Sequence, residues 1–341
     1  MTTPDLLSTV AALLTPGKGI LAADESLATI GKRFAVLDIP STEETRRAYR
    51  ELLFTTPGLN EFISGVILFD ETIHQKAGGL LMPEALNGRG IIPGIKVDIG
   101  TTALPAFADE KITQGLDGLR ERLADYRKSG ACFTKWRAVF AIGERQPTAA
   151  CIEGNARALA RFAALSQEAG LVPIVEPEIV TEGSHTLARC EEVAGIVLQS
   201  VFTALFEQRV MLEGMLLKTA MLLPGTASQQ PTAVAEVAEA TLRCLRRGVP
   251  AAVPGIVFLS GGQSDVVATE RLNAICRTGG APWKLSFSFG RALQDAALQR
   301  WRGDATKTAA AHAMLSNRAR CNSLAVRGLY SAASEQAVVI S

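Results

Sequence analysis

Eight short apolar segments recur along this chain of 341 residues, and they alternate with segments whose patterns predict helices. Segments of this kind suit parallel strands, because a strand covered on both faces need not alternate apolar and polar residues. The predicted strands lie at residues 19–23, 65–69, 94–98, 132–139, 171–176, 211–218, 255–259 and 285–289. Eight repeats without a linker of changed composition predict an α/β fold, a closed (β/α)8 TIM barrel in one domain.

Further patterns lie outside the eight repeats. Residues 6–14 predict a short amphipathic helix before the first strand, and residues 292–301 and 305–327 predict two helices after the last. Residues 331–341 are small and weakly apolar, which is typical of a mobile terminus. We therefore expect a barrel domain over residues 1–330, with extra N- and C-terminal helices, and a flexible tail over residues 331–341.

Composition argues against several classes of protein. The formal net charge is only +1, without a basic patch of the kind that binds nucleic acid. No apolar run reaches the roughly 18 residues of a membrane span, and the first residues lack the pattern of a signal peptide. The six cysteines are scattered and form no metal-ligand pattern with the three histidines. We expect a cytoplasmic protein that binds neither nucleic acid nor membrane and uses no metal.

Lys218 ends the apolar segment before it, where a charged side chain is out of place. Burial disfavours the charged form of an amine, and a neutral amine is a nucleophile towards carbonyl carbon. The alternative is that Lys218 lies in water at the strand end, or pairs with a carboxylate. The remaining strand ends favour the nucleophile.

Polar residues gather at the carboxyl ends of the predicted strands, which is where barrels of this kind place their active sites. These residues are Asp24, Lys96, Lys135, Arg137, Glu176, Glu178, Lys218, Ser260, Ser288 and Arg291. Residues two apart on a strand share a face, so we expect the Lys135 cation near Lys218, with Glu176 supplying a proton-transferring carboxyl. The alternative is a set of salt bridges that closes the barrel mouth.

Two loops predict a phosphate site. Ser260-Gly261-Gly262 follows the seventh strand, and Gly290-Arg291 opens a helix after the eighth. Backbone N–H groups at a helix start bind anions, and these two loops are a recurrent phosphate site in such barrels. Across the mouth, a second group could hold another anion, or its hydroxyls could merely cap a helix. This group comprises Ser26, Thr29, Arg33 and Lys96.

The segments that contain these residues resemble class I fructose-bisphosphate aldolases, the Schiff-base type, from Gly17 to about Tyr330. The resemblance rests on GKGILAADES from Gly17, GIKVD from Gly94, KWR from Lys135, VEPEI from Val175, LLK ending at Lys218, FLSGGQS from Phe258 and SFGRAL from Ser288. It implies a lyase of glycolysis and gluconeogenesis that cleaves fructose 1,6-bisphosphate, needs no cofactor and is a cytosolic homotetramer.

The resemblance also implies a role for each matching residue. Lys218 would form the Schiff base, Glu176 would be the acid/base, and Asp24, Lys135 and Glu178 would be polar partners of the two. Ser260, Gly261, Gly290 and Arg291 would hold the C1 phosphate. Ser26, Thr29, Arg33 and Lys96 would hold the C6 phosphate, and Arg137 would also contact substrate.

This chain departs from the family's pattern at three places. Thr29 stands where serine is more usual, and Thr219-Ala220-Met221 follows the lysine where Pro-Asn-Met is usual. The animal enzymes end in a tyrosine that takes part in proton transfer, whereas this chain ends Val338-Val339-Ile340-Ser341. We therefore expect the enamine to take its proton from water or from a carboxyl of the ring, with Glu176 the first candidate.

Two other functions fit the same residues. One is another Schiff-base barrel lyase that acts on a monophosphate or a shorter sugar, and the second anion site distinguishes it. The other is a sugar-phosphate-binding or scaffolding protein without turnover. Retention of Lys218, Glu176 and Lys135 argues against that function, because binding alone needs no buried nucleophile.

Overall fold

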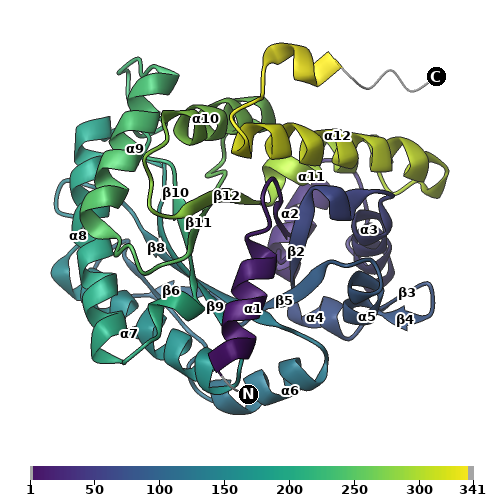
Figure 1. The fold of residues 1–341 in the computed structure, drawn as a ribbon, viewed down its shortest axis with the longest axis horizontal. Coiled ribbons are helices and arrows are strands. Elements are labelled where there is room, and N and C mark those ends of the chain that lie inside the picture. The colour runs from purple at the N-terminus through teal and green to yellow at the C-terminus, as the bar shows by residue number, and fades with distance from the viewer. Residues whose placement is uncertain (1–2, 337–341) are drawn as a thin grey trace.

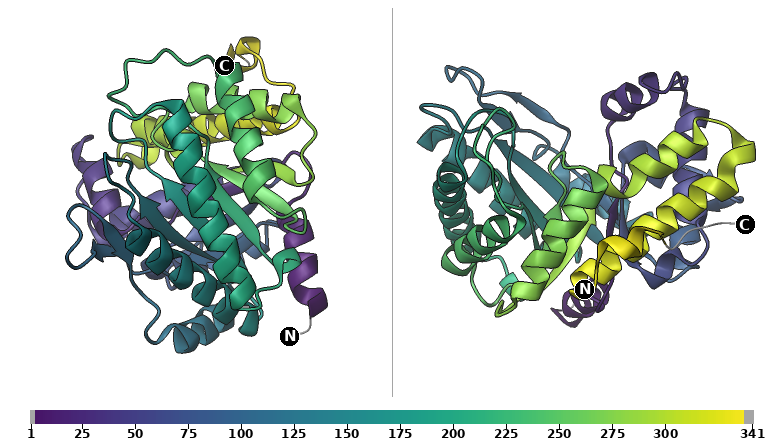
Figure 2. Two further views of the ribbon diagram at one scale, coloured as in Figure 1. Left: turned by 90° about the vertical axis from the view of Figure 1, so that its left-hand side faces the viewer. Right: turned by 90° about the horizontal axis from the view of Figure 1, so that it is seen from above.

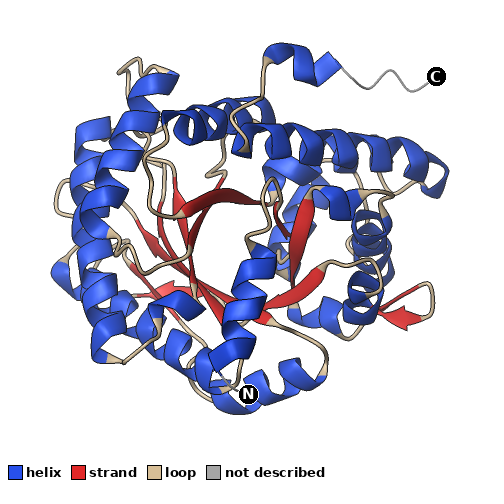
Figure 3. Cartoon of the chain, viewed as in Figure 1, coloured by secondary structure: helices blue, strands red, loops and turns tan. Residues whose placement is uncertain are grey.

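The computed structural model describes residues 3–336, and its eight long parallel strands close into a barrel (Figure 3). Their order around the barrel is β1-β12-β11-β10-β9-β8-β5-β2. The strands are β1 Gly19–Ala22, β2 Ile63–Leu68, β5 Ile92–Lys96, β8 Phe133–Phe140, β9 Val172–Ile179, β10 Leu216–Ala220, β11 Gly255–Leu259 and β12 Lys284–Phe289. All eight lie where the apolar segments predict them, so the (β/α)8 barrel is confirmed.

Helices surround the strands (Figure 1). Several begin at a Ser or Thr whose side chain accepts a hydrogen bond from a backbone N–H three residues on, as at Thr148, Thr186 and Ser264. The helices that follow α1 are α2 Leu27–Ala35, α3 Glu43–Thr55, α4 Asp70–Ile73, α5 Met82–Asn87, α6 Leu119–Lys128, α7 Ala149–Glu168, α8 Leu187–Glu207, α9 Val234–Gly248, α10 Asp265–Thr278, α11 Arg291–Trp301 and α12 Thr308–Val326.

The structure differs from the predicted elements in two respects. The sixth strand begins later than expected, because Leu212–Gly214 form a short 3-10 helix, η2, that leads into β10. Two small antiparallel hairpins were not predicted, namely β3 Lys76–Ala77 with β4 Leu80–Leu81, and β6 Thr101–Ala103 with β7 Lys111–Thr113. Strands of two or three residues are too short to show an alternating pattern.

Helix α1 (Thr3–Leu13) lies across one end of the barrel, as Figure 1 and the right-hand view of Figure 2 show. Leu6, Val10 and Leu13 are buried there against the apolar side chains that enter the barrel from its strands, including Phe133 and Leu216. Because α1 closes the end at which strands such as β8 and β10 begin, the cavity described below opens at the opposite end.

Tyr330 and Glu335 hold the chain after α12 against the barrel's outer helices. Ala332–Gln336 form a 3-10 helix, η4, and the Tyr330 hydroxyl lies 2.6 Å from Glu335 Oε1. Glu335 also pairs with the buried Arg318 of α12. Helical structure and side-chain contacts are therefore present as far as Gln336, within the first part of the predicted tail. The rest of that prediction, residues 337–341, lies outside the described residues.

Two features are absent from residues 3–336. No helix among them is long and apolar enough to cross a membrane. They also contain no group of three or more His, Cys, Asp or Glu side chains placed to hold a metal ion.

Candidate active site

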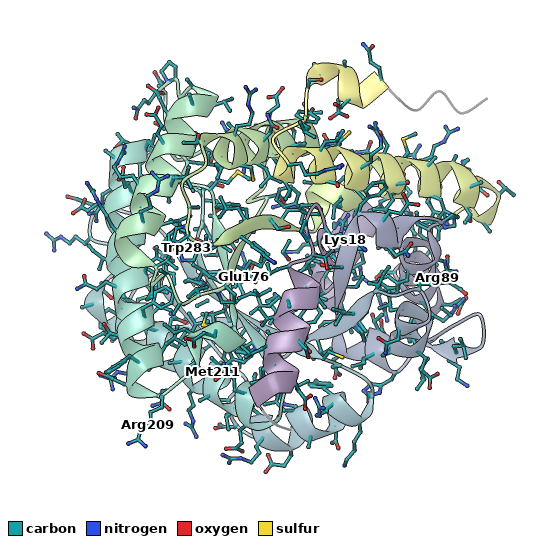
Figure 4. The ribbon with its side chains drawn as sticks, viewed as in Figure 1. Lys18, Arg89, Glu176, Arg209, Met211 and Trp283 are labelled. Carbon is teal, nitrogen blue, oxygen red and sulfur yellow. The ribbon has the colours of Figure 1, made fainter. Side chains whose placement is uncertain are left out.

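The carboxyl ends of the strands surround a cavity of about 930 Å3. Every residue predicted for the site lines it, from the catalytic candidates to both candidate phosphate groups. Figure 4 places Glu176 near the middle of the barrel, inside the ring of strands. Their position at the carboxyl ends of the predicted strands was therefore enough to predict that these side chains line one cavity.

Glu176 lies between two lysines. Its Oε1 is 3.1 Å from Lys218 Nζ, and its Oε2 is 3.3 Å from Lys135 Nζ. Lys135 Nζ is also 2.7 Å from Asp24 Oδ2. All three strand residues are nearly inaccessible to solvent, with relative exposures of 3–4%. Lys135 was expected near Lys218, and the structure adds that a carboxylate bridges the two cations.

The lysines keep both carboxylates ionised. Burial alone would raise the pKa of Asp24, but Lys135 and Lys218 outweigh that penalty and lower the pKa to about 2. The same two cations hold the pKa of Glu176 below its ordinary value despite burial. Burial would lower the pKa of Lys135, yet Asp24 and Glu176 raise it above that of an ordinary lysine. Lys135 is therefore a fixed cation, and Glu176 is a carboxylate able to accept a proton.

Asp98 organises the third strand end. Its Oδ1 lies 2.6 Å from Lys96 Nζ, and its Oδ2 accepts a hydrogen bond of 3.3 Å from the backbone N–H of Arg137. The Arg137 guanidinium in turn pairs with Glu178 on the neighbouring strand. Two cations predicted to face substrate thus each have a carboxylate partner.

Arg33 is more strongly engaged than the prediction allowed. Its guanidinium pairs with Glu25, lies 2.8 Å from Asp295 Oδ1, and donates to Gln294 Oε1 at 3.1 Å. Glu25 also pairs with the buried Arg50 of α3 at 2.7 Å. Arg33 therefore ties α2 to α11. A phosphate that bound Arg33 would have to compete with these partners.

The cavity also contains an unpaired cation. Arg291 is exposed and has no carboxylate or hydrogen-bond partner within residues 3–336. It opens α11, and its Nη2 lies 3.3 Å from where a Cβ at Gly262 would stand. The Ser288 hydroxyl on β12 is buried in the lining of the same cavity, without a hydrogen-bond partner among the described residues. This part of the cavity is the better prepared for an anion.

Comparison with known proteins agrees with this geometry. A family model described as fructose-bisphosphate aldolase class-I matches residues 5–340. The chain belongs to this family. It is therefore an enzyme of the lyase class, and the family's place in glycolysis agrees with the sequence-based expectation.

Similar proteins come from bacteria, plants and a parasite. A probable class 1 aldolase of Xanthomonas axonopodis pv. citri is 52% identical over 330 residues, covering 96% of this chain and 99% of the relative. The cytosolic fructose-bisphosphate aldolase 4 of Arabidopsis thaliana is 49% identical, covering 96% and 84%. A structure of the Plasmodium falciparum aldolase, in complex with TRAP and a small-molecule inhibitor, is 49% identical with a TM-score of 0.95, covering 96% of this chain and 95% of that one.

Sequence reasoning missed three residues that the aldolase site depends on. Asp98 stands two positions after Lys96, and the same-face rule for strands could have paired them. Glu25 follows Asp24 directly, but its partner Arg50 lies on a separate helix that no local pattern connects to it. The contact between Glu25 and Arg50 depends on the packing of α2 and α3, which the sequence pattern does not specify.

Proposed function

We propose that the chain reversibly cleaves fructose 1,6-bisphosphate to dihydroxyacetone phosphate and glyceraldehyde 3-phosphate through a Schiff base on Lys218. The observation that carries this proposal is the contact of 3.1 Å between Lys218 Nζ and Glu176 Oε1 inside the barrel mouth. Covalent catalysis by lysine needs an amine beside a group that takes its proton and returns it to a leaving hydroxyl. Glu176 is placed to do both.

The proposed reaction begins as Lys218 gives a proton to Glu176 and its amine adds to the C2 ketone. Glu176 returns the proton to the C2 hydroxyl, and water leaves to give a protonated imine. The C4 hydroxyl then gives its proton to the Glu176 carboxylate, the C3–C4 bond breaks, and the bonding electrons move into the imine to give an enamine. Glyceraldehyde 3-phosphate leaves first. Protonation of the enamine at C3 and hydrolysis of the imine then release dihydroxyacetone phosphate and free Lys218.

Asp24, Lys135 and Glu178 serve this chemistry as charged neighbours in the proposal. Lys135 holds both Asp24 and Glu176, so its cation fixes the position of the proton-transferring carboxyl. A fixed positive charge beside Glu176 also stabilises its ionised form, which the first proton transfer requires. Glu178 orients Arg137 at the rim of the cavity, where the guanidinium can contact substrate.

The two phosphates are assigned to opposite ends of the cavity. Ser260, Gly261, Gly290 and Arg291 would hold the C1 phosphate, since Arg291 is an unpaired cation at a helix start. Ser26, Thr29 and Lys96 would hold the C6 phosphate. Arg33 would support that end through Glu25 and Asp295 rather than as a free ligand. Ser26 also caps α2 by accepting a hydrogen bond from the Thr29 N–H, and the two hydroxyls lie 3.0 Å apart.

One observation favours a second candidate, a Schiff-base lyase specific for a monophosphate. Lys96 and Arg33 at the C6 end are already paired with carboxylates, whereas Arg291 at the C1 end is not. The test is steady-state cleavage of fructose 1,6-bisphosphate and of fructose 1-phosphate by one preparation, with both products measured. The proposal predicts a clearly higher kcat/KM for the bisphosphate. Equal values would contradict that preference, a higher kcat/KM for fructose 1-phosphate would favour the second candidate, and no cleavage of either would contradict both.

We also propose that the chain works in the cytoplasm as a homotetramer that binds sugar phosphates. Relatives named as cytosolic support the location. Ile196 and Phe206 on α8 are 47% and 84% exposed, and exposed apolar side chains of this size are typical of a surface that another subunit covers. Sedimentation equilibrium should give four times the mass of one chain. The mass of a single chain would contradict the assembly.

A further inference from the structure

The glycine turn after β11 is closed by a hydrogen bond of 3.1 Å from the Gln263 N–H to the Ser260 carbonyl oxygen, but the peptide unit between its two glycines has no hydrogen-bond partner within the turn. Gly261 and Gly262 have φ angles of +56° and +78°, in the left-handed region that favours glycine. Within residues 3–336, the backbone N–H of neither glycine has a hydrogen-bond acceptor. Two consecutive glycines allow the peptide unit between them to rotate, so an anion site built from this unit needs contacts from outside the turn.

Thr181, in the loop after β9, supplies such a contact. Its hydroxyl donates a hydrogen bond of 3.3 Å to the carbonyl oxygen of Gly261. In a trans peptide unit the C=O and N–H point in opposite directions. With the Gly261 carbonyl held by Thr181, the N–H of Gly262 therefore points away from Thr181. Gly262 itself lies against Arg291 Nη2.

Thr181 is held firmly enough to act in this way. Its carbonyl oxygen accepts a hydrogen bond of 2.8 Å from the N–H of Thr226, in the loop after β10. Two more backbone hydrogen bonds of 2.8 Å join the same loops, from Gly225 to His185 and from Ala227 to Gly183. The loops after β9 and β10 therefore form one unit, and the Thr181 hydroxyl joins that unit to the glycine turn.

We propose that Thr181 is a positioning residue for the substrate phosphate, because it orients the Gly261–Gly262 peptide unit beside Arg291. This inference rests on the proposed function and deepens it. Gln263 holds the turn from the other side, since its Nε2 donates to the Ser260 carbonyl oxygen at 2.8 Å. Thr181 touches no reacting atom, and its effect passes to the phosphate through the backbone of the turn.

The test compares wild type with Thr181→Val, which has nearly the same shape without the hydroxyl, and with Thr181→Ser, which keeps the hydroxyl. Thr278→Val is the matched control, because Thr278 is exposed at the end of α10 and, among the described residues, its hydroxyl bonds only to Ala274 of its own helix. The readouts are kcat and KM for fructose 1,6-bisphosphate, and the inhibition constant of inorganic phosphate. Thermal melting of each variant confirms that it is folded.

A neutral hydrogen bond of ordinary net strength corresponds to about a two- to twelvefold change in binding. We expect Thr181→Val to raise both KM and the phosphate inhibition constant by about that factor while kcat changes less than about twofold. Thr181→Ser and Thr278→Val should resemble wild type. Unchanged phosphate inhibition in Thr181→Val, or failure of Thr181→Ser to restore it, would overturn the inference.

Arg291→Ala separates this inference from the proposed function. Suppose that phosphate inhibition is weaker than in wild type in Arg291→Ala but unchanged in Thr181→Val. That result would leave the phosphate site in place and overturn only the role of Thr181. Unchanged inhibition in Arg291→Ala would contradict the phosphate site itself, and the inference with it.

Discussion

Glu176 is the residue on which both site lysines converge, so its removal tests the proton transfers. Glutamine at this position keeps the shape but cannot accept a proton. We expect Glu176→Gln to lower kcat for fructose 1,6-bisphosphate by about 10²- to 10⁴-fold, the usual contribution of a general acid or base. Glu239→Gln, on the exposed face of α9, is the control. A kcat within about threefold of wild type would remove Glu176 from the mechanism.

Lys135 is expected to matter for stability as well as for catalysis. Replacing it with methionine leaves two buried carboxylates without their shared cation, a kind of change that costs about 3–5 kcal/mol. Adding Asp24→Asn to Lys135→Met removes one of those carboxylates and should recover part of the loss. Urea unfolding of wild type, both single variants and the double variant measures the coupling. If the changes in unfolding free energy were strictly additive, Lys135 and Asp24, whose charged atoms lie 2.7 Å apart, would have no energetic coupling.

The sequence predicted which residues line the cavity, but it did not predict the ion pairs that they form. Lys218, Glu176 and Lys135 were predictable because each is a charged residue at the end of an apolar strand. Which carboxylate each cation meets depends on side-chain geometry across different elements. Arg33 illustrates the limit, because its partner Asp295 lies on α11, at the far end of the chain.

At the scale of elements, the existence of the eight barrel strands followed from their apolar pattern. The start of α10 at Asp265 agrees with the local sequence, since the Ser264 side chain caps the helix. Helix η2 before β10 was not predicted, because Leu212-Glu213-Gly214 opens a segment that is otherwise apolar and fits a strand equally well. The contacts after Tyr330 were also missed, since they depend on Glu335 meeting Arg318 rather than on any apolar pattern.

The segment after α12 gives a prediction for two truncations. Removing residues 337–341 leaves the Glu335–Arg318 pair intact, so melting temperature and turnover should change little. Removing residues 331–341 leaves the buried Arg318 with only Asp265, at 3.6 Å, as a carboxylate partner. That variant should melt lower while its turnover at a permissive temperature stays close to wild type.

Exchange of the C3 proton of dihydroxyacetone phosphate with solvent completes this test. A large, selective fall in exchange in either truncated protein, with Schiff-base formation intact, would show that the tail carries the proton step.

For the whole molecule, the buried carboxylates predict how stability depends on pH. Asp24, Glu25 and Glu176 all have lowered pKa values in the folded state, about 2 for Asp24. Their contribution is therefore present above the unfolded-state pKa of about 4 and is lost as pH falls towards the folded value. Urea midpoints should be similar at about pH 7 and pH 5 and fall steeply by about pH 3. A midpoint unchanged down to about pH 3 would contradict the paired network.

The covalent intermediate on Lys218 is the central claim, and borohydride trapping tests it most directly. The protein is mixed with dihydroxyacetone phosphate, reduced with borohydride, digested and analysed by mass spectrometry. One adduct per chain is expected, on the peptide that contains Lys218, and none in Lys218→Ala, which should also lose cleavage activity. An adduct on another lysine, no adduct at all, or a Lys218→Ala protein that still turns over at close to the wild-type rate would contradict the mechanism.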